Sequence, residues 1–227
     1  MTDIVSYSQI GKVAALTMDD GKVNAISPVM SAALESGLDR AVNEADAIVI
    51  RGRDGVFCGG FDLKIIQGDD QEQKNQMGEA GMALLKRIFM LPKPVIFAVT
   101  GHAVAMGALL TLTGDARIGI SGNFRIGLNE TSIGLLLPIT GIELARDRLD
   151  PRFFQRATIN AELFSPEDAV RSGYLDYVTN TLDFDSAITK MSNDLATLDF
   201  KAFSETKRRV RQPTLDRIIE LERRLRQ

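Results

Sequence analysis

Two glycine-rich segments have the composition of turns that could bind a negatively charged oxygen. Residues 51–63 include the pair Gly59-Gly60, and residues 100–109 are rich in small side chains just before an apolar helical stretch. Glycine allows backbone N–H groups to point together at one atom, and the first turn of a helix has N–H groups without helical partners. Two such turns that converge would form an oxyanion hole, which stabilises charge on a carbonyl oxygen during a reaction.

A third segment, residues 124–135, supplies one carboxylate, Glu130, among apolar and neutral neighbours. A carboxylate in such surroundings can have a raised pKa and can act as general base and then as general acid. A helix cap or an ion-paired glutamate is the more common reason for an isolated glutamate. Both interpretations therefore stay open when this residue is considered alone.

Other reactive residue types lack the partners that their chemistry requires. His102 is the single histidine and no G-x-S-x-G sequence accompanies it, so a turn position is the better interpretation. Cys58 is the single cysteine and is interpreted as a small buried residue. The chain has no G-x-G-x-x-G, no phosphate-binding loop and no Cys/His cluster, so we expect no dinucleotide, no nucleoside triphosphate and no metal.

The elements that would position these segments alternate between strands and helices. Residues 4–18 read as a hairpin and residues 27–44 as a helix capped by Ser27 with Pro28 next. Short β-branched runs at 46–52, 95–99 and 116–120 predict strands buried on both faces, with helical stretches between them. This order is typical of an α/β fold with parallel crossovers, and the chain becomes mainly helical after Pro138.

Composition places the chain among ordinary globular proteins. It has 227 residues, of which 44% are hydrophobic and 25% charged, with a net charge of −3. No run of 18 apolar residues predicts a membrane span, and no targeting segment is visible, so we expect a cytoplasmic protein that binds neither membrane nor nucleic acid.

Residues 204–227 contain eight Lys/Arg against four acids. We interpret this tail as a helix from Pro213 with a solvated basic face that packs on a neighbouring subunit, rather than as a phosphate-binding surface.

Taken in order, four pieces of the sequence resemble the crotonase, or enoyl-CoA hydratase/isomerase, superfamily over about residues 4–178. They are residues 23–26 (VNAI), 57–63 (FCGGFDL), 101–107 (GHAVAMG) with Gly114-Asp115 behind them, and 129–134 (NETSIG). The resemblance implies an α/β spiral of ββα units over residues 1–180. It also implies a helical C-terminal region over residues 181–227, shorter than usual for the family, that builds a homotrimer or a dimer of trimers.

The resemblance further implies an acyl-CoA thioester as the substrate, with no cofactor beyond the coenzyme A that it carries. The backbone N–H groups of Phe61 and Met106 would hold the thioester oxygen, and Glu130 would be the catalytic acid and base. The residues that match the CoA contacts of the family are Val23, Ala25, Cys58, Gly60, Asp62 and Leu63.

One departure from the family pattern bears on the reaction. Hydratases of this family use two glutamates, and the position of the first falls on Leu109 here, whereas the second falls on Glu130. The sequence therefore predicts an isomerase that moves a double bond from carbon 3 to carbon 2. The alternatives are a hydratase that uses Glu130 alone or with Glu143, and a protein that binds acyl-CoA or assembles with a partner without catalysis.

Overall fold

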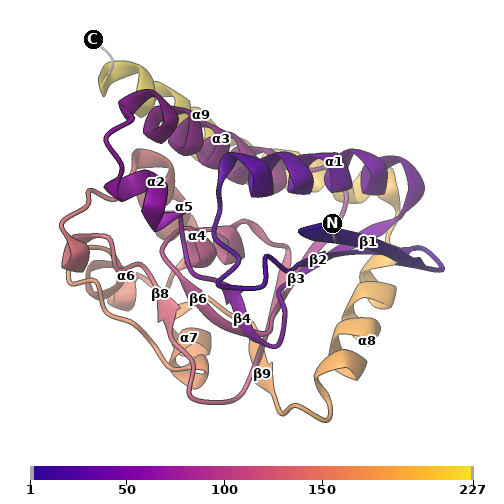
Figure 1. The fold of residues 1–227 in the computed structure, drawn as a ribbon. Helices are drawn as coiled ribbons and strands as arrows, with labels where there is room; N and C mark the ends of the chain where they lie inside the picture. Colours follow the sequence, from indigo (N-terminus) through magenta and orange to yellow (C-terminus); the bar gives the residue numbers. More distant parts are fainter. Residues whose placement is uncertain (1–2, 226–227) are drawn as a thin grey trace.

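The computed structural model describes residues 3–225, which form two β-sheets surrounded by helices (Figure 1). The larger sheet has the order β1-β2-β3-β5-β7-β9, in which β1 and β2 form an antiparallel hairpin and the other neighbours are parallel. Its strands are β1 (Val5–Ile10), β2 (Val13–Met18), β3 (Ala47–Arg51), β5 (Val95–Val99), β7 (Ala116–Ile120) and β9 (Tyr177–Thr179).

The smaller sheet has the order β4-β6-β8 and is parallel throughout. Its strands are β4 (Gly55–Cys58), β6 (Gly101–Val104) and β8 (Ile126–Gly127). Each of these short strands follows a strand of the larger sheet and precedes a helix, namely α2 (Leu63–Gln67) with α3 (Gln71–Met90), then α4 (Met106–Thr113), then α5 (Ile139–Arg148). The chain is thus a succession of ββα units, which confirms the predicted fold class.

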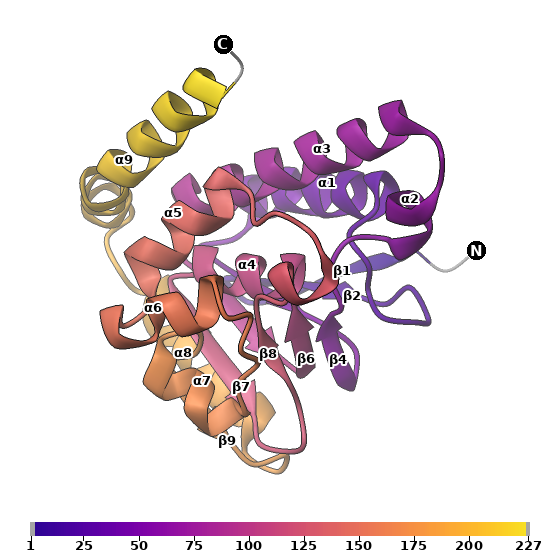
Figure 2. The same cartoon turned by 90° about the vertical axis from the view of Figure 1, so that its left-hand side faces the viewer.

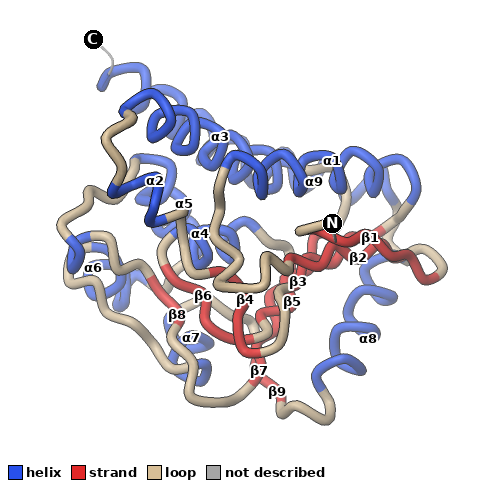
Figure 3. The backbone as a smooth tube through the Cα atoms, viewed as in Figure 1, coloured by secondary structure: helices blue, strands red, loops and turns tan. Residues whose placement is uncertain are grey.

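The central strands of the larger sheet are buried on both faces, as their β-branched composition predicts. Alternate side chains such as Ile48 and Phe97 join the main core, and their neighbours Val49 and Ile96 join a second core beneath α8 (Phe184–Ala196). Figure 3 shows the strands between α1 and α3 on one side and α8 on the other. The T-shaped contact of Phe57 with Phe97, with ring centroids 5.7 Å apart, links the two sheets.

The helix predicted over residues 27–44 is α1 (Pro28–Glu44), with the cap that the sequence predicts. The Ser27 hydroxyl accepts a hydrogen bond from the Met30 N–H at 3.2 Å. Further along the chain, α6 (Pro151–Thr158) and α7 (Pro166–Ser172) precede β9. No helix within residues 3–225 is long and apolar enough to cross a membrane.

The last helix, α9 (Phe200–Leu225), differs from the prediction. It begins at Phe200, and Pro213, expected at its start, lies inside it. Its two halves run in different directions in Figure 2, as expected where a proline ring displaces the carbonyl of the preceding turn. In its second half Ile218 is buried, whereas Ile219 and Leu225 are exposed.

The interpretation of the basic tail as a solvated face was wrong for two of its cations. Lys207 and Arg211 are buried, and both pair with Asp115 of the same chain, at 2.6 and 2.9 Å. Arg211 also donates hydrogen bonds to the carbonyl oxygens of Phe89, Thr113 and Gly114, at the ends of α3 and α4. Helix C-termini have carbonyl groups without helical partners, so a buried guanidinium satisfies them here.

Candidate active site

The three candidate segments follow three adjacent parallel strands. β4, β6 and β8 lie side by side (Figure 2), and residues 59–63, 105–109 and 128–135 continue from their carboxyl ends. In β6 and β8, Val104 is opposite Gly127, and the Ala105 N–H donates to the Gly127 carbonyl at 3.0 Å. Ligands of α/β proteins bind outside the carboxyl ends of parallel strands, so this edge of the small sheet is where a site is expected.

The two glycine-rich turns meet at Gly60 and Ala105. Gly60 has a φ of +109°, and a methyl group placed on it would lie 3.1 Å from the Ala105 Cβ and 3.9 Å from the Met106 nitrogen. Ala105 also has a positive φ, +52°, which is rare for a residue with a side chain. Such strained residues gather at functional sites, where the surrounding structure holds them in place.

The two N–H groups expected to bind an oxygen, those of Phe61 and Met106, take no part in the backbone hydrogen bonds of the segments that carry them. Ile26 donates to the Gly60 carbonyl at 2.8 Å and accepts from the Asp62 N–H at 3.4 Å. In extended backbone successive groups alternate in direction, so the N–H of Phe61 points away from Ile26. Met106 is the first residue of α4, whose start has no side-chain cap, so its N–H has no partner within the helix.

Gly107 sets how closely α4 approaches β4. A methyl group on Gly107 would lie 2.1 Å from the Cys58 carbonyl oxygen, a distance that two backbone segments can relieve only by moving apart. We expect Gly107→Ala to lower the free energy of unfolding by about 1–3 kcal/mol. Because Met106 precedes Gly107, the same shift should move the Met106 N–H and reduce turnover.

Urea denaturation and steady-state kinetics of Gly107→Ala would measure both effects. Gly78→Ala is the matched control, because a methyl group on this α3 glycine meets no atom within 4 Å. The free energy of unfolding of the control should rise by about 0.5–1 kcal/mol, because alanine is favoured over glycine within a helix. A Gly107→Ala variant as stable and as active as wild type would contradict the proposed close packing.

Glu130 is the buried carboxylate of the site. It is 8% exposed, and its Oε2 has no hydrogen-bond partner among residues 3–225. Burial raises the pKa of Glu130, and hydrogen bonds from the backbone at Glu130 and Asn129 oppose this rise only in part. Although it precedes the short 3-10 helix η1 (Thr131–Ile133), its side chain does not cap it. The capping interpretation therefore fails, and the environment suits a general base that later acts as an acid.

The residues that match CoA contacts lie along one strip of the surface. The Gly59 N–H donates to the Val23 carbonyl at 2.8 Å, which places the segment of Val23 and Ala25 beside the one from Cys58 to Leu63. Val23 and Leu63 are more than half exposed. Cys58 and Gly60 are buried, so neither residue is exposed on this strip. Asp62 caps α2 by accepting the Lys64 N–H at 2.9 Å.

Asn24 holds this strip in place, a role that the sequence analysis missed. Its side chain is fully buried and donates to the carbonyl oxygens of Met18 and Phe57, at 3.0 and 3.1 Å. Its φ is +52°, a conformation that asparagine tolerates better than most residues. Asp20 completes the turn by accepting the N–H groups of Asn24 and Ala25. The signal was the Asp-Asp-Gly-Lys-Val-Asn run, which is typical of side-chain-bonded turns.

Leu109 and Glu143 distinguish this site from one with two carboxylates. Leu109 is 1% exposed, and its Cδ2 lies 3.1 Å from a methyl group placed on Gly141 of α5. Glu143, considered as a second acid, is buried and paired with Arg146 and Arg217 at 3.3 and 3.1 Å. Its carboxylate therefore has a structural role that links α5 to α9.

Of the two remaining candidate groups, Cys58 is buried as the sequence predicts, whereas the turn position predicted for His102 is wrong. Burial raises the pKa of Cys58 to about 12, so the thiol is unreactive at neutral pH. His102 lies on β6 rather than in a turn, and its Nδ1 accepts the Arg125 N–H at 3.1 Å. Within residues 3–225 no group of three or more His, Cys, Asp or Glu side chains could hold a metal ion.

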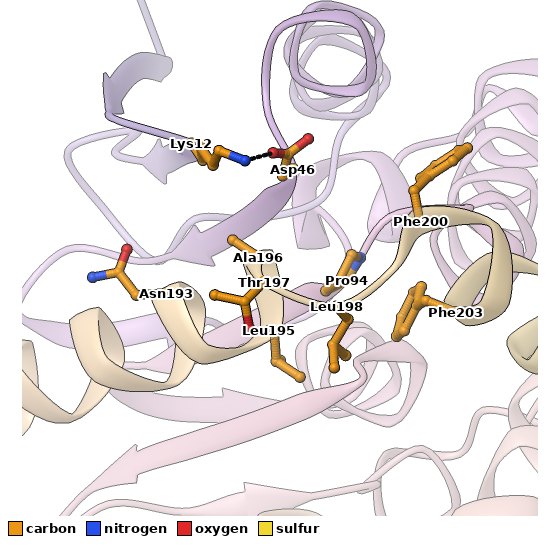
Figure 4. A pocket seen from close by; sticks show the side chains of 10 residues that line it. All are labelled: Lys12, Asp46, Pro94, Asn193, Leu195, Ala196, Thr197, Leu198, Phe200 and Phe203. Atoms are coloured by element: carbon orange, nitrogen blue, oxygen red, sulfur yellow. Dashed lines mark ion pairs between the residues drawn. The ribbon is translucent and has the colours of Figure 1, made fainter.

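A separate pocket of about 550 Å³ lies at the amino ends of β2, β3 and β5, away from the three candidate segments (Figure 4). Its acidic and basic groups, Asp46 and Lys12, pair at 3.1 Å. It is lined by Lys12, Asp46, Pro94, Asn193, Leu195, Ala196, Thr197, Leu198, Phe200 and Phe203. Because these two groups pair with each other, this pocket offers no free acid or base that could do the proton transfer expected of Glu130.

Comparison with known proteins agrees with this geometry. A structure of an enoyl-CoA hydratase/isomerase family protein from Pseudomonas syringae is 41% identical, covers 98% of this chain and 97% of its own, and superposes with a TM-score of 0.93. A Mycobacterium tuberculosis protein at 37% identity is described in one structure as a probable enoyl-CoA hydratase (TM-score 0.92, 96% of this chain and 92% of that chain). A second structure describes it as an enoyl-CoA isomerase (TM-score 0.91, 97% and 96%).

Sequence comparison leads to the same group of proteins. A carnitinyl-CoA dehydratase from Salmonella enteritidis is 27% identical over 198 residues, which cover 86% of this chain and 75% of that protein. The sequence model of the enoyl-CoA hydratase/isomerase family matches residues 9–227. The chain therefore belongs to the enoyl-CoA hydratase/isomerase family, whose members act on acyl-CoA thioesters.

Proposed function

We propose that this acyl-CoA enzyme converts a 3-enoyl-CoA into the 2-enoyl-CoA. The observation that carries the proposal is a single buried carboxylate, Glu130, without a side-chain partner among the described residues, near two turns with free N–H groups. An isomerisation needs one group that removes a proton and returns it elsewhere, together with stabilisation of the charge that develops between the two steps.

In the proposed reaction the thioester oxygen accepts hydrogen bonds from the N–H groups of Phe61 and Met106. Glu130 removes a proton from carbon 2, and the electrons move onto the thioester oxygen to form a dienolate. The protonated Glu130 then returns the proton at carbon 4, so the double bond lies between carbons 2 and 3 and the carboxylate is regenerated. No cofactor beyond the coenzyme A of the substrate takes part.

An isomerase is preferred over a hydratase because hydration also requires a positioned and activated water molecule. Leu109 stands at the position that matches the first hydratase glutamate, and an aliphatic side chain neither orients nor deprotonates water. Glu143 is engaged by two arginines and is not free for this role. The description of the Mycobacterium tuberculosis relative as an isomerase agrees with this preference, although the same protein is also described as a probable hydratase.

A direct product assay tests the proposal. The purified protein is incubated with 3-hexenoyl-CoA and, separately, with crotonyl-CoA, and the thioesters are identified by chromatography and mass. We expect 3-hexenoyl-CoA to give 2-hexenoyl-CoA of unchanged mass and crotonyl-CoA to remain unchanged. A product 18 mass units heavier from crotonyl-CoA, the mass of one added water, would instead assign a hydratase. No change in either substrate, together with calorimetric binding of a CoA ester, would support the non-catalytic alternative.

We also propose that CoA lies along the strip formed by Val23, Ala25, Asp62 and Leu63, next to the buried residues Cys58 and Gly60 that match CoA contacts of the family. The homotrimer or dimer of trimers that the resemblance implies is part of the same proposal, as is a cytoplasmic location. Sedimentation velocity would distinguish a trimer from a hexamer, and a monomer would contradict the proposed assembly.

A further inference from the structure

Tyr174 lies beneath the segment that carries Glu130. It follows Gly173, which ends α7, and its side chain is fully buried. Its ring contacts Phe164 with centroids 5.9 Å apart. Phe164 in turn exchanges two backbone hydrogen bonds with Ile126 of β8, at 2.8 and 3.0 Å. The tyrosine is therefore fixed against the strand that leads to Glu130.

Three buried polar atoms around this position lack hydrogen-bond partners within the described part of the chain. They are the Tyr174 hydroxyl, the Glu130 Oε2 and the Asn129 Oδ1. Buried polar groups in folded proteins are almost always hydrogen-bonded, because an unpartnered one is destabilising. A hydroxyl can donate a hydrogen bond and a carboxylate can only accept one, so the first two atoms are chemically complementary.

The two groups are also coupled through charge. Burial is the main reason that the pKa of Tyr174 is raised and the negative charge of Glu130 is the second, whereas the backbone N–H of Leu128, which the hydroxyl approaches, opposes the rise. The pKa of Glu130, by contrast, responds to burial and to backbone groups and not to a charged side chain. Charged groups on the neighbouring helices are paired with one another, as Arg152 with Asp150, Arg156 with Glu162 and Arg171 with Asp168.

We propose that Tyr174 is a positioning residue for Glu130, whose charged carboxylate accepts a hydrogen bond at Oε2 from a water molecule that the Tyr174 hydroxyl holds. A bond to Oε2 leaves the other carboxylate oxygen to face the substrate, and it fixes the rotation of the carboxyl group. This inference rests on the proposed function, in which Glu130 moves the proton between carbons 2 and 4.

The test measures the titration of Glu130 without turnover. Infrared difference spectra of the full-length, ligand-free protein are recorded across pH, and Glu130→Gln identifies the carboxyl band of Glu130 by its loss. Tyr174→Phe removes the donor and keeps the ring. Since a donor favours the charged carboxylate, we expect the midpoint of Glu130 in Tyr174→Phe to rise by about one pH unit. Tyr177→Phe, a matched change at a tyrosine of β9, should leave the midpoint unchanged.

A purely structural Tyr174 gives a different result. Its replacement by phenylalanine would then leave the Glu130 midpoint in place and keep or raise the melting temperature, since an unpartnered hydroxyl is lost. That outcome overturns the proposal. If Tyr174→Phe does not fold, the wild-type chain with its three tyrosines replaced by fluorotyrosine gives the opposite test. Fluorination makes the hydroxyl a stronger donor, so the midpoint should fall, and an unchanged midpoint again overturns the proposal.

Kinetics separates this inference from the proposed function. If the protein isomerises 3-hexenoyl-CoA, the acidic limb of its kcat profile should move upward in Tyr174→Phe with the infrared midpoint, while KM changes little. If it has no isomerase activity but the infrared midpoint still moves, the proposed function fails and the pairing of Tyr174 with Glu130 stands.

Discussion

Replacement of Glu130 by glutamine is expected to lower turnover of 3-hexenoyl-CoA by about two to four orders of magnitude, the usual contribution of a general acid and base. Glutamine keeps the shape of the side chain but cannot accept the carbon-2 proton. The oxyanion-binding N–H groups of Phe61 and Met106 belong to the backbone and are unchanged. Binding of a CoA ester, measured by calorimetry, should therefore stay close to that of wild type.

Glu167→Gln is the matched control for this variant. Glu167 is an exposed residue in the first turn of α7, so its substitution makes the same chemical change away from the site. It should keep wild-type turnover. Undiminished turnover in Glu130→Gln would remove Glu130 from the reaction. A parallel loss of turnover and of CoA-ester binding would indicate damage to the fold instead of a missing base.

The same substitution should change the pH dependence of stability. The pKa of Glu130 is raised in the folded state, so the folded protein holds this proton more tightly than the unfolded chain does. The resulting stability is present below the unfolded pKa and is lost as pH rises through the folded pKa. Glutamine does not ionise, so Glu130→Gln does not lose stability as the pH rises. Its melting temperature at pH 7 should therefore equal or exceed that of wild type, and the difference should shrink toward pH 4.

Asp115→Asn is expected to lower the free energy of unfolding by about 3–5 kcal/mol, the usual result of leaving buried charges without their partner. Asp115 Oδ2 accepts from Lys207 Nζ at 2.6 Å and from the Val95 N–H at 2.8 Å, and its Oδ1 pairs with Arg211 at 2.9 Å. The side chains of all three charged residues are at most 11% exposed. Asparagine keeps the shape but removes the charge that both cations share.

Urea denaturation at pH 7 measures this effect, and Asp185→Asn provides the control. Asp185 pairs with Arg51 at 3.1 Å, but its side chain is 76% exposed, so its loss should change stability by at most about 1 kcal/mol. Equal stabilities of Asp115→Asn and wild type would show that Arg211 and Lys207 are satisfied by backbone carbonyls without the carboxylate.

The strands of the larger sheet could be predicted because their apolar runs are long enough to have a pattern. The strand predicted over residues 116–120 is β7, with the same ends. The smaller sheet could not be predicted, because its strands are very short. β8 has two residues, β4 and β6 have four each, and each of the three contains a glycine. Such segments are too short for a hydrophobic period, so the sequence predicts turns over β4 and β6 and no element over β8.

The candidate residues were nevertheless found, because the glycines and the lone glutamate are visible in the sequence. What the sequence does not reveal is a long-range partner. Nothing near Lys207 indicates that its counter-ion is Asp115, 92 positions earlier, and nothing near Tyr174 indicates that the charge of Glu130 acts on its pKa. The basic tail was therefore assigned to the surface, and Tyr174 received no role.

The anchoring of α9 on Asp115 has a consequence for biosynthesis. At about 5–20 residues per second, a ribosome makes the 92 residues between Asp115 and Lys207 in roughly 5–20 s. During this interval β7, β8 and β9 complete the two sheets, and the ends of α3 and α4 have been made, but the cations that pair with Asp115 and bond those ends have not. The Asp115 carboxylate must stay hydrated until Lys207 and Arg211 emerge, so the packing of the core around it has to follow synthesis of the first half of α9.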